Sequence, residues 1–441
     1  MAIKAKIMTV VTVAALCCTA GVAYATPKIQ HWQSESGAKV LFVEDHNIPM
    51  LDVSVNFAAG NSFDAADRAG VASLTRRMLA LGVAGMNEDD IASGMADIGA
   101  VLGGEFSQDM AGVSVRTLSQ AEVREQALAI MARVLQTPTF PEDVLTREKT
   151  RTIAALKEAE TKPDSIADRA FRKAIYGNHP YGLMSEVESV EKITVTDIQG
   201  FYRKHYNPGN AVVAIMGDVS RQLAEKIAEN LTAKLPISDE MPALPEVAMQ
   251  IAPSEQRIEH PATQSHILVG SPGMSRTDPD YTVLYVGNYI LGGGGFVSRL
   301  MEEVREKRGL AYSVYSYFMP LKQPGIFQIG LQTKKEQADE ALQLVRKTLS
   351  EFIEQGPTEK ELQAAKDNII GGFPLRIDSN RKIIGYLGVI GFYDLPLTYL
   401  DDFSNRVEKV SVEQIQDAFS RRINPEAMAT VIVGAPEVAT Q

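Results

Sequence analysis

Cysteine is nearly absent from this chain. Its 441 residues include two cysteines, Cys17 and Cys18, and both lie within the first apolar stretch. No thiol follows that stretch, which excludes disulfide bonds, thiolate metal sites and a cysteine nucleophile in the rest of the chain. Histidine is also scarce, and no two of the six histidines are three or four residues apart. A pair of imidazoles one helical turn apart is therefore missing.

An excess of positive charge is missing as well. The formal net charge is -11 at pH 7. Nucleic acids and anionic membranes bind basic patches, so neither is an expected partner. Hydrophobic residues make up 45% of the chain and charged residues 22%, which is typical of a globular protein. A chain of this length is large enough for two or more domains.

The N-terminus carries the features of an export signal. Lys4 and Lys6 precede an almost wholly apolar stretch over residues 7–20, and Ala23-Tyr24-Ala25 forms a small-x-small cleavage site. These features predict a secretory signal peptide over residues 1–25, and hence a periplasmic protein. A membrane anchor is the alternative, but the apolar stretch is shorter than the roughly 20 residues that span a bilayer.

Cleavage after residue 25 would make the chain more acidic. It removes two lysines and no acidic residue, which changes the formal charge from -11 to -13. The residues before Cys17 and Cys18 do not have the order of a lipoprotein signal. No later apolar stretch is long enough for a transmembrane helix, so we expect no membrane partner for the mature chain.

An internal repeat organises the rest of the chain. A helix, an Asn-Pro turn and a buried strand recur 217 residues apart without a gap. The matching segments are Glu191–Gln199 with Glu408–Gln416, Asn207-Pro208 with Asn424-Pro425, and 212–216 with 429–433.

The repeat divides the chain into two homologous halves. The stretch from Leu235 to Pro253 is rich in proline, alanine and acidic residues, as linkers are. We therefore predict an N-terminal domain over residues 26–235, a linker over 236–253 and a C-terminal domain over 254–441.

Within each half, strand patterns come first, long amphipathic helices follow and a strand closes the half. Candidate strands are Lys39–Glu44, Leu51–Ala58, Val113–Leu118, Ser265–Gly270, Tyr312–Phe318 and Ile326–Leu331. Candidate helices are Arg147–Glu160, Gln337–Glu354 and Glu359–Ile370. The pattern predicts an α+β protein in which helices cover an antiparallel-rich sheet in each half.

Distinctive short motifs occur in both halves. Those of the second half are Leu291-Gly292-Gly293-Gly294, Ser298-Arg299-Leu300 and Val304–Val314. Those of the first half are Ala69-Gly70-Val71-Ala72, His179-Pro180-Tyr181-Gly182 and Tyr206–Val219. In sequence and in order these motifs closely resemble the pitrilysin/insulinase peptidase family, over nearly the whole mature chain. The resemblance implies two tandem halves of the pitrilysin-like metallohydrolase fold.

One motif of that family is lost. Active members carry His-x-x-Glu-His on a helix after the Ala-Gly-Val-Ala-like segment, and here that place reads Ser73-Leu74-Thr75-Arg76-Arg77. Zinc catalysis there needs two imidazoles and a carboxylate that takes a proton from the metal-bound water. The family's motif positions are occupied here by Ser73, Arg76 and Arg77, which supply neither imidazole nor carboxylate. Arginine also stays protonated and repels a dication. We therefore expect no zinc in this chain and no peptidase activity from it alone.

The third zinc ligand of the family is a glutamate on a later helix. Glu148, Glu158 and Glu160 are acidic there, but the best-matched position, seven residues after Glu148, is Ala155. His260 and His266 lie near a probable strand, where we expect ordinary surface or hydrogen-bonded histidines. The four glycines 292–295 lack a following Gly-Lys-Ser/Thr, so they predict a helix end and a tight turn rather than a phosphate loop.

Another part of the family's site is retained. By resemblance, Arg305 and Tyr312 match an arginine-tyrosine pair that faces the zinc site across a closed chamber in active relatives. A phenol can donate to an oxyanion and a guanidinium can bind substrate carbonyls. The alternative without the resemblance is structural: a solvated arginine on a charged helix, and a core tyrosine that opens a strand.

Some family members work as pairs of unlike subunits. The resemblance implies that this chain is a non-catalytic subunit of a heterodimeric zinc peptidase, in which a homologous zinc-motif partner hydrolyses peptides or unfolded polypeptides. Zinc is then expected in the partner subunit. A peptide-binding or scaffold protein with no role in cleavage is the alternative. A lone enzyme with an unrecognised metal site is a third possibility.

Overall fold

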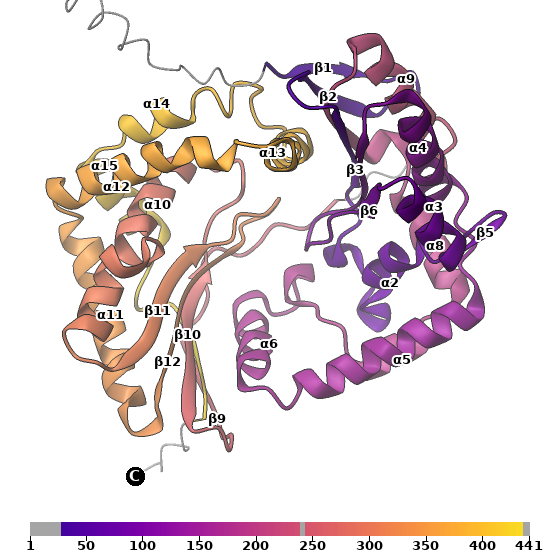
Figure 1. Ribbon diagram of the computed structural model, residues 1–441. Coiled ribbons are helices and arrows are strands. Elements are labelled where there is room, and N and C mark those ends of the chain that lie inside the picture. Colours follow the sequence, from indigo (N-terminus) through magenta and orange to yellow (C-terminus); the bar gives the residue numbers. More distant parts are fainter. Residues whose placement is uncertain (1–27, 239–242, 435–441) are drawn as a thin grey trace, which may run out of the picture.

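The computed structural model describes residues 28–238 and 243–434 and contains two large sheets, each with helices packed on it (Figure 1). The predicted signal peptide lies outside the described residues, as does part of the predicted linker. The strand order is β1-β2-β8-β3-β7-β6 in the first sheet and β11-β12-β10-β13-β9 in the second. Neighbouring strands are antiparallel, except that β2 runs parallel to β8 and β9 to β13. The predicted α+β fold with antiparallel-rich sheets is confirmed.

The strands of the first sheet are β1 (Gln30–Gln33), β2 (Lys39–Glu44), β3 (Met50–Phe57), β6 (Val101–Gly103), β7 (Ala111–Leu118) and β8 (Ala211–Gly217). A small hairpin consists of β4 (Gly82–Val83) and β5 (Met86–Asn87). The strands of the second sheet are β9 (Ser254–Ile258), β10 (Gln264–Pro272), β11 (Ala311–Phe318), β12 (Ile326–Lys334) and β13 (Ala429–Val433).

The helices of the first half are α2 (Val71–Met78), α3 (Glu88–Asp97), α4 (Ala121–Gln136), α5 (Glu142–Ala159), α6 (Pro163–Tyr176), α7 (Val187–Lys192), α8 (Val195–His205) and α9 (Arg221–Thr232). Those of the second half are α10 (Tyr281–Asn288), α11 (Ala338–Gln355), α12 (Glu359–Gly372), α13 (Asn380–Phe392), α14 (Phe403–Glu408) and α15 (Val412–Arg422), with π-helical turns η5 (Tyr289–Gly293) and η7 (Met301–Glu306). No helix in the described part of the chain is long and apolar enough to cross a membrane.

The internal repeat extends further in the structure than in the sequence. Helices α4 and α11, α5 and α12, α6 and α13, and α8 and α15 form pairs whose first residues are 217 positions apart. The last pair even begins with the same capping box: Thr194 caps α8 with Asp197, and Ser411 caps α15 with Gln414. The two halves are therefore copies of one helix-and-strand plan.

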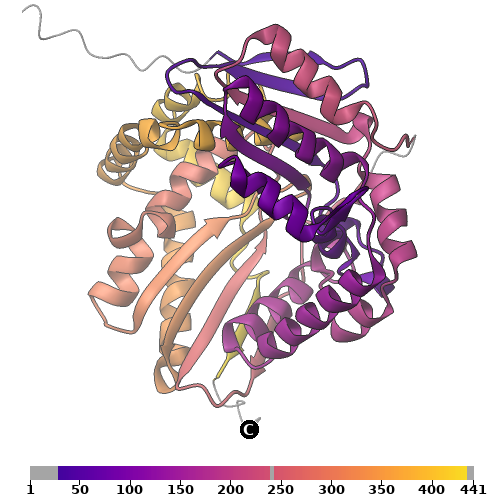
Figure 2. The ribbon, with the colours of Figure 1, turned by 45° about the vertical axis from the view of Figure 1, so that its right-hand side comes forward.

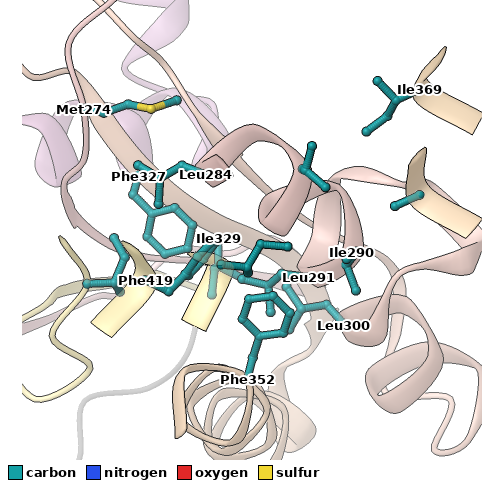
Figure 3. Packing of buried hydrophobic residues seen from close by; sticks show 14 of the residues in the cluster. Met274, Leu284, Ile290, Leu291, Leu300, Phe327, Ile329, Phe352, Ile369 and Phe419 are labelled. Carbon is teal, nitrogen blue, oxygen red and sulfur yellow. The ribbon is translucent and has the colours of Figure 1, made fainter. Parts of the chain in front are cut away.

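Each sheet packs against helices of its own half on one face. In the first half, alternate residues of β3 from Leu51 to Phe57 belong to the core under those helices. In Figure 2 the indigo and purple helices of this half cover that face. In the second half, aromatic residues of β12, α11 and α15, namely Phe327, Phe352 and Phe419, meet in the core (Figure 3).

The other face of each sheet is covered in part by one helix of the opposite half. Helix α13 packs on β2, β3 and β8 of the first sheet, and α6 packs on β10 and β13 of the second (Figure 1). Apolar residues on this face of β2 and β8, including Leu41 and Val212, consequently share a core with the second half. Phe171 of α6 likewise packs with Leu268 and Val431 of the second sheet. This exchange fixes the two halves relative to each other.

A buried carboxylate also joins the halves. Asp109 accepts hydrogen bonds from the hydroxyls of Tyr181 (2.7 Å) and Tyr393 (2.9 Å) and from the backbone N–H of Lys322 (2.7 Å). Tyr181 belongs to the first half, whereas Lys322 and Tyr393 belong to the second. Burial raises the pKa of Asp109, and these donors oppose the rise. One side chain thus ties three separate segments together.

The close contact of α13 with the first sheet depends on a glycine. A Cβ atom at Gly391 would lie 2.5 Å from Val212 Cγ1 and 2.6 Å from Leu41 Cδ1. We expect Gly391→Ala to lower the free energy of unfolding by about 1–3 kcal/mol, measured by urea denaturation, because the core there is already filled. Gly385→Ala on the same helix is the control, since its Cβ would meet nothing within 4 Å. Equal stability of the two variants would contradict this packing.

Candidate functional site

The helix that carries the lost zinc motif is held firmly at its start. Gly70 precedes α2 with φ of +108°, a conformation that favours glycine. The Asp64 carboxylate accepts from the backbone N–H groups of Gly70 (2.7 Å) and Ala72 (2.8 Å). Burial raises the pKa of Asp64 to about 7, although these two hydrogen bonds lower it. The scaffold of the site is therefore intact although the ligands are gone.

Arg77 occupies the last position of the lost motif and forms an ion pair with α5. Its Nη1 lies 3.3 Å from Oε2 of Glu148, whose side chain is only 3% exposed. Arg147 (3.2 Å) and Arg151 (2.8 Å) contact the other oxygen of the same carboxylate. Three guanidiniums thus surround one buried glutamate, and this cluster of positive charge repels a dication.

The other two motif positions are engaged with backbone. Ser73 Oγ donates to the carbonyl of Gly70 (3.1 Å), and Arg76 Nη2 donates to the carbonyl of Gly103 at the end of β6 (2.9 Å). Burial lowers the pKa of the Arg76 guanidinium, while Tyr206 and Glu105 oppose the shift. Ser73, Arg76 and Arg77 therefore do not fit a zinc ion.

A metal site elsewhere in the described residues would need three or more ligating side chains close together. No group of three or more histidine, cysteine, aspartate or glutamate side chains there could hold a metal ion. Ala155, the best match to the third ligand, is an exposed residue of α5. His260 accepts from the N–H of Ala262 and contacts the Thr161 carbonyl, whereas His266 is half-buried and burial lowers its pKa.

The glycine-rich motif of the second half ends a helix, as predicted. Helix α10 continues into η5, and Gly295 turns the chain with φ of +62°. A Cβ atom at Gly292 would lie 2.6 Å from the backbone nitrogen of Ser316 in β11, so only glycine allows this approach. The motif therefore places the next helix, η7, close beside β11.

An ion pair anchors the start of that helix. Arg299 donates to both carboxylate oxygens of Glu361 on α12, at 2.6 and 2.8 Å, in a bidentate arrangement. Burial acts to raise the pKa of Glu361, but hydrogen bonds from Arg299 and Thr358 outweigh it and hold the pKa at about 2. The pair fixes the segment that leads to Arg305.

The structure brings Arg305 and Tyr312 together. Arg305 lies on η7 and Tyr312 on β11, and the guanidinium carbon of Arg305 is 5.2 Å from the centre of the Tyr312 ring. The ring of Phe296 is also close to the guanidinium carbon, at 4.6 Å, and the sequence did not single out this aromatic neighbour. The Tyr312 side chain is 82% exposed, so the structural alternative of a core tyrosine is wrong.

This arrangement has clear chemical capacity. The phenol of Tyr312 makes no hydrogen bond to any described residue, so its O–H is available to a ligand. Arg305 is held by two rings and by a 3.7 Å contact with Glu306, which keeps the guanidinium beside the phenol. Together they can bind a polarised carbonyl. The lost zinc motif lies on α2 of the first half, whereas this pair lies on η7 and β11 of the second.

A two-repeat fold with an arginine-filled metal position and an exposed arginine-tyrosine pair defines a degenerate metallopeptidase-like protein. Residues 39–186 match the family model described as insulinase (peptidase family M16), and residues 192–369 match the one described as peptidase M16 inactive domain. The chain belongs to the M16 peptidase family, as the resemblance predicted.

Individual relatives are similar to this chain over most of its length. The solved peptidase M16 inactive domain from Pseudomonas fluorescens is 41% identical, covers 94% of this chain and 99% of its own, and has a TM-score of 0.89. The non-peptidase homologue YmxG of Helicobacter pylori is 27% identical over 87% of this chain and 89% of its own length. The periplasmic protease PqqL of Escherichia coli shares the fold, with 16% identity, a TM-score of 0.79, and coverage of 93% of this chain and 46% of that chain.

The arginine cluster around Glu148 predicts a stability effect. Glu148→Gln leaves three guanidiniums without their buried carboxylate, and we expect it to lower the free energy of unfolding by about 1–3 kcal/mol in urea denaturation. Glu142→Gln, at an exposed position of the same helix, is the matched control and should cost less than about 1 kcal/mol. A Glu148→Gln variant as stable as the control would show that the cluster contributes no net stability.

The Arg299–Glu361 pair predicts a pH dependence. The pKa of Glu361 is about 2 in the folded chain and ordinarily 4.5, so its contribution is present above pH 4.5 and is lost as the pH falls toward 2. Thermal unfolding of the wild type should therefore lose stability in this window, by less than about 3 kcal/mol from this group. Glu361→Gln should be less stable at neutral pH and flatter below pH 4.5. Parallel pH profiles would contradict the assignment.

Proposed function

We propose that this chain is the non-catalytic subunit of a two-chain zinc peptidase, and that it supplies Arg305 and Tyr312 to the active site of a homologous zinc-bearing partner. The observation that carries the proposal is the contrast between the two halves. The metal position is filled by the Arg77–Glu148 ion pair, whereas Arg305 and Tyr312 are adjacent, anchored and accessible. A chain that had lost its catalytic role entirely has no need of an exposed, oriented pair.

The roles of the two residues follow from their chemistry. Metal binding and water activation would belong to the partner, since no group of three or more metal-ligating side chains in the described residues of this chain could hold a metal ion. Arg305 would bind a carbonyl of the peptide backbone through its guanidinium. Tyr312 would donate a hydrogen bond to the carbonyl oxygen as negative charge develops on it. The flanking Phe296 would keep water away from the guanidinium and so strengthen that contact.

The proposal includes the export of this chain to the periplasm and the class of its substrates. Residues 1–25 have the features of a cleaved signal peptide, and one structural neighbour is described as a periplasmic protease. A periplasmic location would give the chain access to peptides or unfolded polypeptides as substrates. We also propose the domain limits of 26–235 and 254–441, with a linker between them. The last helix of the first half ends at Thr232, and the second sheet begins at Ser254.

A scaffold or peptide-binding role without cleavage is the second candidate. It is favoured by the description of the Helicobacter pylori relative as a non-peptidase homologue. In that case Phe296, Val297 and Tyr312, which are all strongly exposed, would serve as a contact surface. Mutation of Tyr312 would then weaken binding without any change in a cleavage rate.

The two candidates differ in the effect of a single oxygen atom. In a mixture of this chain with a zinc-motif homologue from the same cell, we expect Tyr312→Phe to reduce cleavage of a quenched peptide by about 10²–10³-fold, because one oxyanion donor is lost. Assembly and thermal stability should not change, because the phenol is exposed.

Arg305→Ala should also reduce turnover strongly, through loss of the backbone contact. Arg308→Ala is its matched control, because Arg308 lies just after the same helix and pairs with Glu303 instead. Turnover that survives Tyr312→Phe unchanged would refute the catalytic role of the pair.

A further inference from the structure

A cavity with several charged side chains in its wall lies between the two halves, and neither Arg305 nor Tyr312 lines it. It has a volume of about 650 Å³ and is lined by β3, β6 and β7 of the first sheet and by α13 of the second half. It occupies the part of the sheet face that α13 leaves uncovered. We call it the α13 cavity.

The charge of the α13 cavity is opposite to that of the chain. Four basic side chains and two acidic ones line it, whereas the whole chain has a net charge of -11. The basic residues are Arg116, Arg276, Arg381 and Lys382, and the acidic ones are Asp52 and Glu105. Lys382 is paired with Asp378, but Arg381 makes no hydrogen bond to any described residue. A locally positive wall in an acidic protein favours an anionic group.

Two buried side chains with hydrogen-bond acceptors line the same cavity as the basic residues. Asp52 and Asn56 of β3 are 5% and 3% exposed and line the cavity. Asp52 Oδ1 is 3.6 Å from Arg116, but Asp52 Oδ2 and Asn56 Oδ1 have no hydrogen-bond partner in the described chain. Burial raises the pKa of Asp52, and Arg116 and Arg381 oppose the rise. Unmet buried acceptors are costly, so a ligand that brings a donor would satisfy them.

Three glycines of α13 determine where the helix contacts the first sheet and where space remains between them. A Cβ atom at Gly388 would approach Asn56 to 2.9 Å, and one at Gly391 would meet Val212, so the helix touches the sheet there. A Cβ atom at Gly385, one turn earlier, would meet nothing within 4 Å. The space therefore begins where the helix leaves the sheet.

The repeat places a cavity of opposite charge in the other half. Asp164 and Asp168 of α6 lie 217 positions before Arg381 and Gly385 of α13. These two aspartates line a separate cavity of about 360 Å³ against the second sheet. The two copies of one helix thus present arginine in one half and aspartate in the other.

We propose that the α13 cavity binds the carboxy-terminal end of a peptide. The free α-carboxylate would accept from the guanidiniums of Arg381 and Arg116, and the N–H of the last peptide bond would donate toward Asp52 or Asn56. A phosphate monoester dianion suits the site less well, because its phosphate group brings no donor and its two charges would face the Asp52 carboxylate. The backbone of an internal peptide segment has no negative charge to pair with the arginines. The choice of a peptide rests on the proposed function; the preference for a free carboxylate rests on the cavity.

The test compares two forms of one probe. A short peptide with fluorescein at its N-terminus is prepared with a free carboxy terminus and as the carboxy-terminal amide, and its binding to the purified chain is followed by fluorescence anisotropy. We expect the free acid to bind about tenfold or more tightly than the amide, because charge-assisted hydrogen bonds are lost in the amide. Arg381→Gln should weaken binding of the free acid to the level of the amide.

Two further variants keep the test decisive. Gly385→Leu fills the cavity without removing any charge and should abolish binding of both forms. Arg133→Gln, an exposed arginine of α4 on a helix outside the cavity, makes the same charge change as Arg381→Gln and should bind like the wild type. Equal affinity of acid and amide, or equal behaviour of Arg381→Gln and Arg133→Gln, would overturn the proposal. No partner subunit is present, so the result is independent of whether the pair cleaves peptides.

Discussion

The exchange of one helix between the two halves is the constraint on which the rest of the structure depends. Helix α13 closes part of the first sheet and α6 closes part of the second, so each half completes the core of the other. Apolar residues of β2 and β8 would otherwise be exposed to water, which is unfavourable in proportion to their area. The hydrogen bonds that Asp109 accepts from Tyr181, Lys322 and Tyr393 add polar contacts across the same boundary. The two halves consequently share core contacts, and a cavity lies between them.

Loss of the metal motif left the local scaffold in place. Asp64 still caps α2 and the helix still packs on α5, but Arg77 now contacts Glu148 where the family has a metal ligand. An arginine-carboxylate pair at such a position compensates a buried negative charge without a cation from solution. The second half shows no comparable change: Arg299 and Glu361 hold η7, and Arg305 stands beside Tyr312. The loss of the zinc motif in the first half and the retention of the arginine-tyrosine pair in the second are consistent with the proposal that two chains contribute to one active site.

The fold class, most helices and strands and the Arg305–Tyr312 pair could be predicted from the sequence, because they depend on local patterns, on the internal repeat or on a short motif. Strand Lys39–Glu44 has the predicted bounds, and most other predicted helices and strands differ by one or two residues, with Arg147–Glu160 starting five residues too late. The adjacency of Arg305 and Tyr312 followed from the family motif. The exchange of α6 and α13 could not be predicted, because amphipathic periodicity shows that a helix face is buried but not which sheet covers it. Asp109 and the α13 cavity depend on contacts between distant segments, and single residues give no sequence signal for these.

The central claim is that this chain completes an active site it cannot form alone. The most direct measurement is turnover of a quenched peptide as the chain is titrated into a fixed amount of a zinc-motif homologue from the same cell. The account predicts no turnover by this chain alone, and activity that rises to a plateau at equimolar ratio. Turnover by this chain without the homologue, or activity of the homologue that does not change at any ratio, would contradict it.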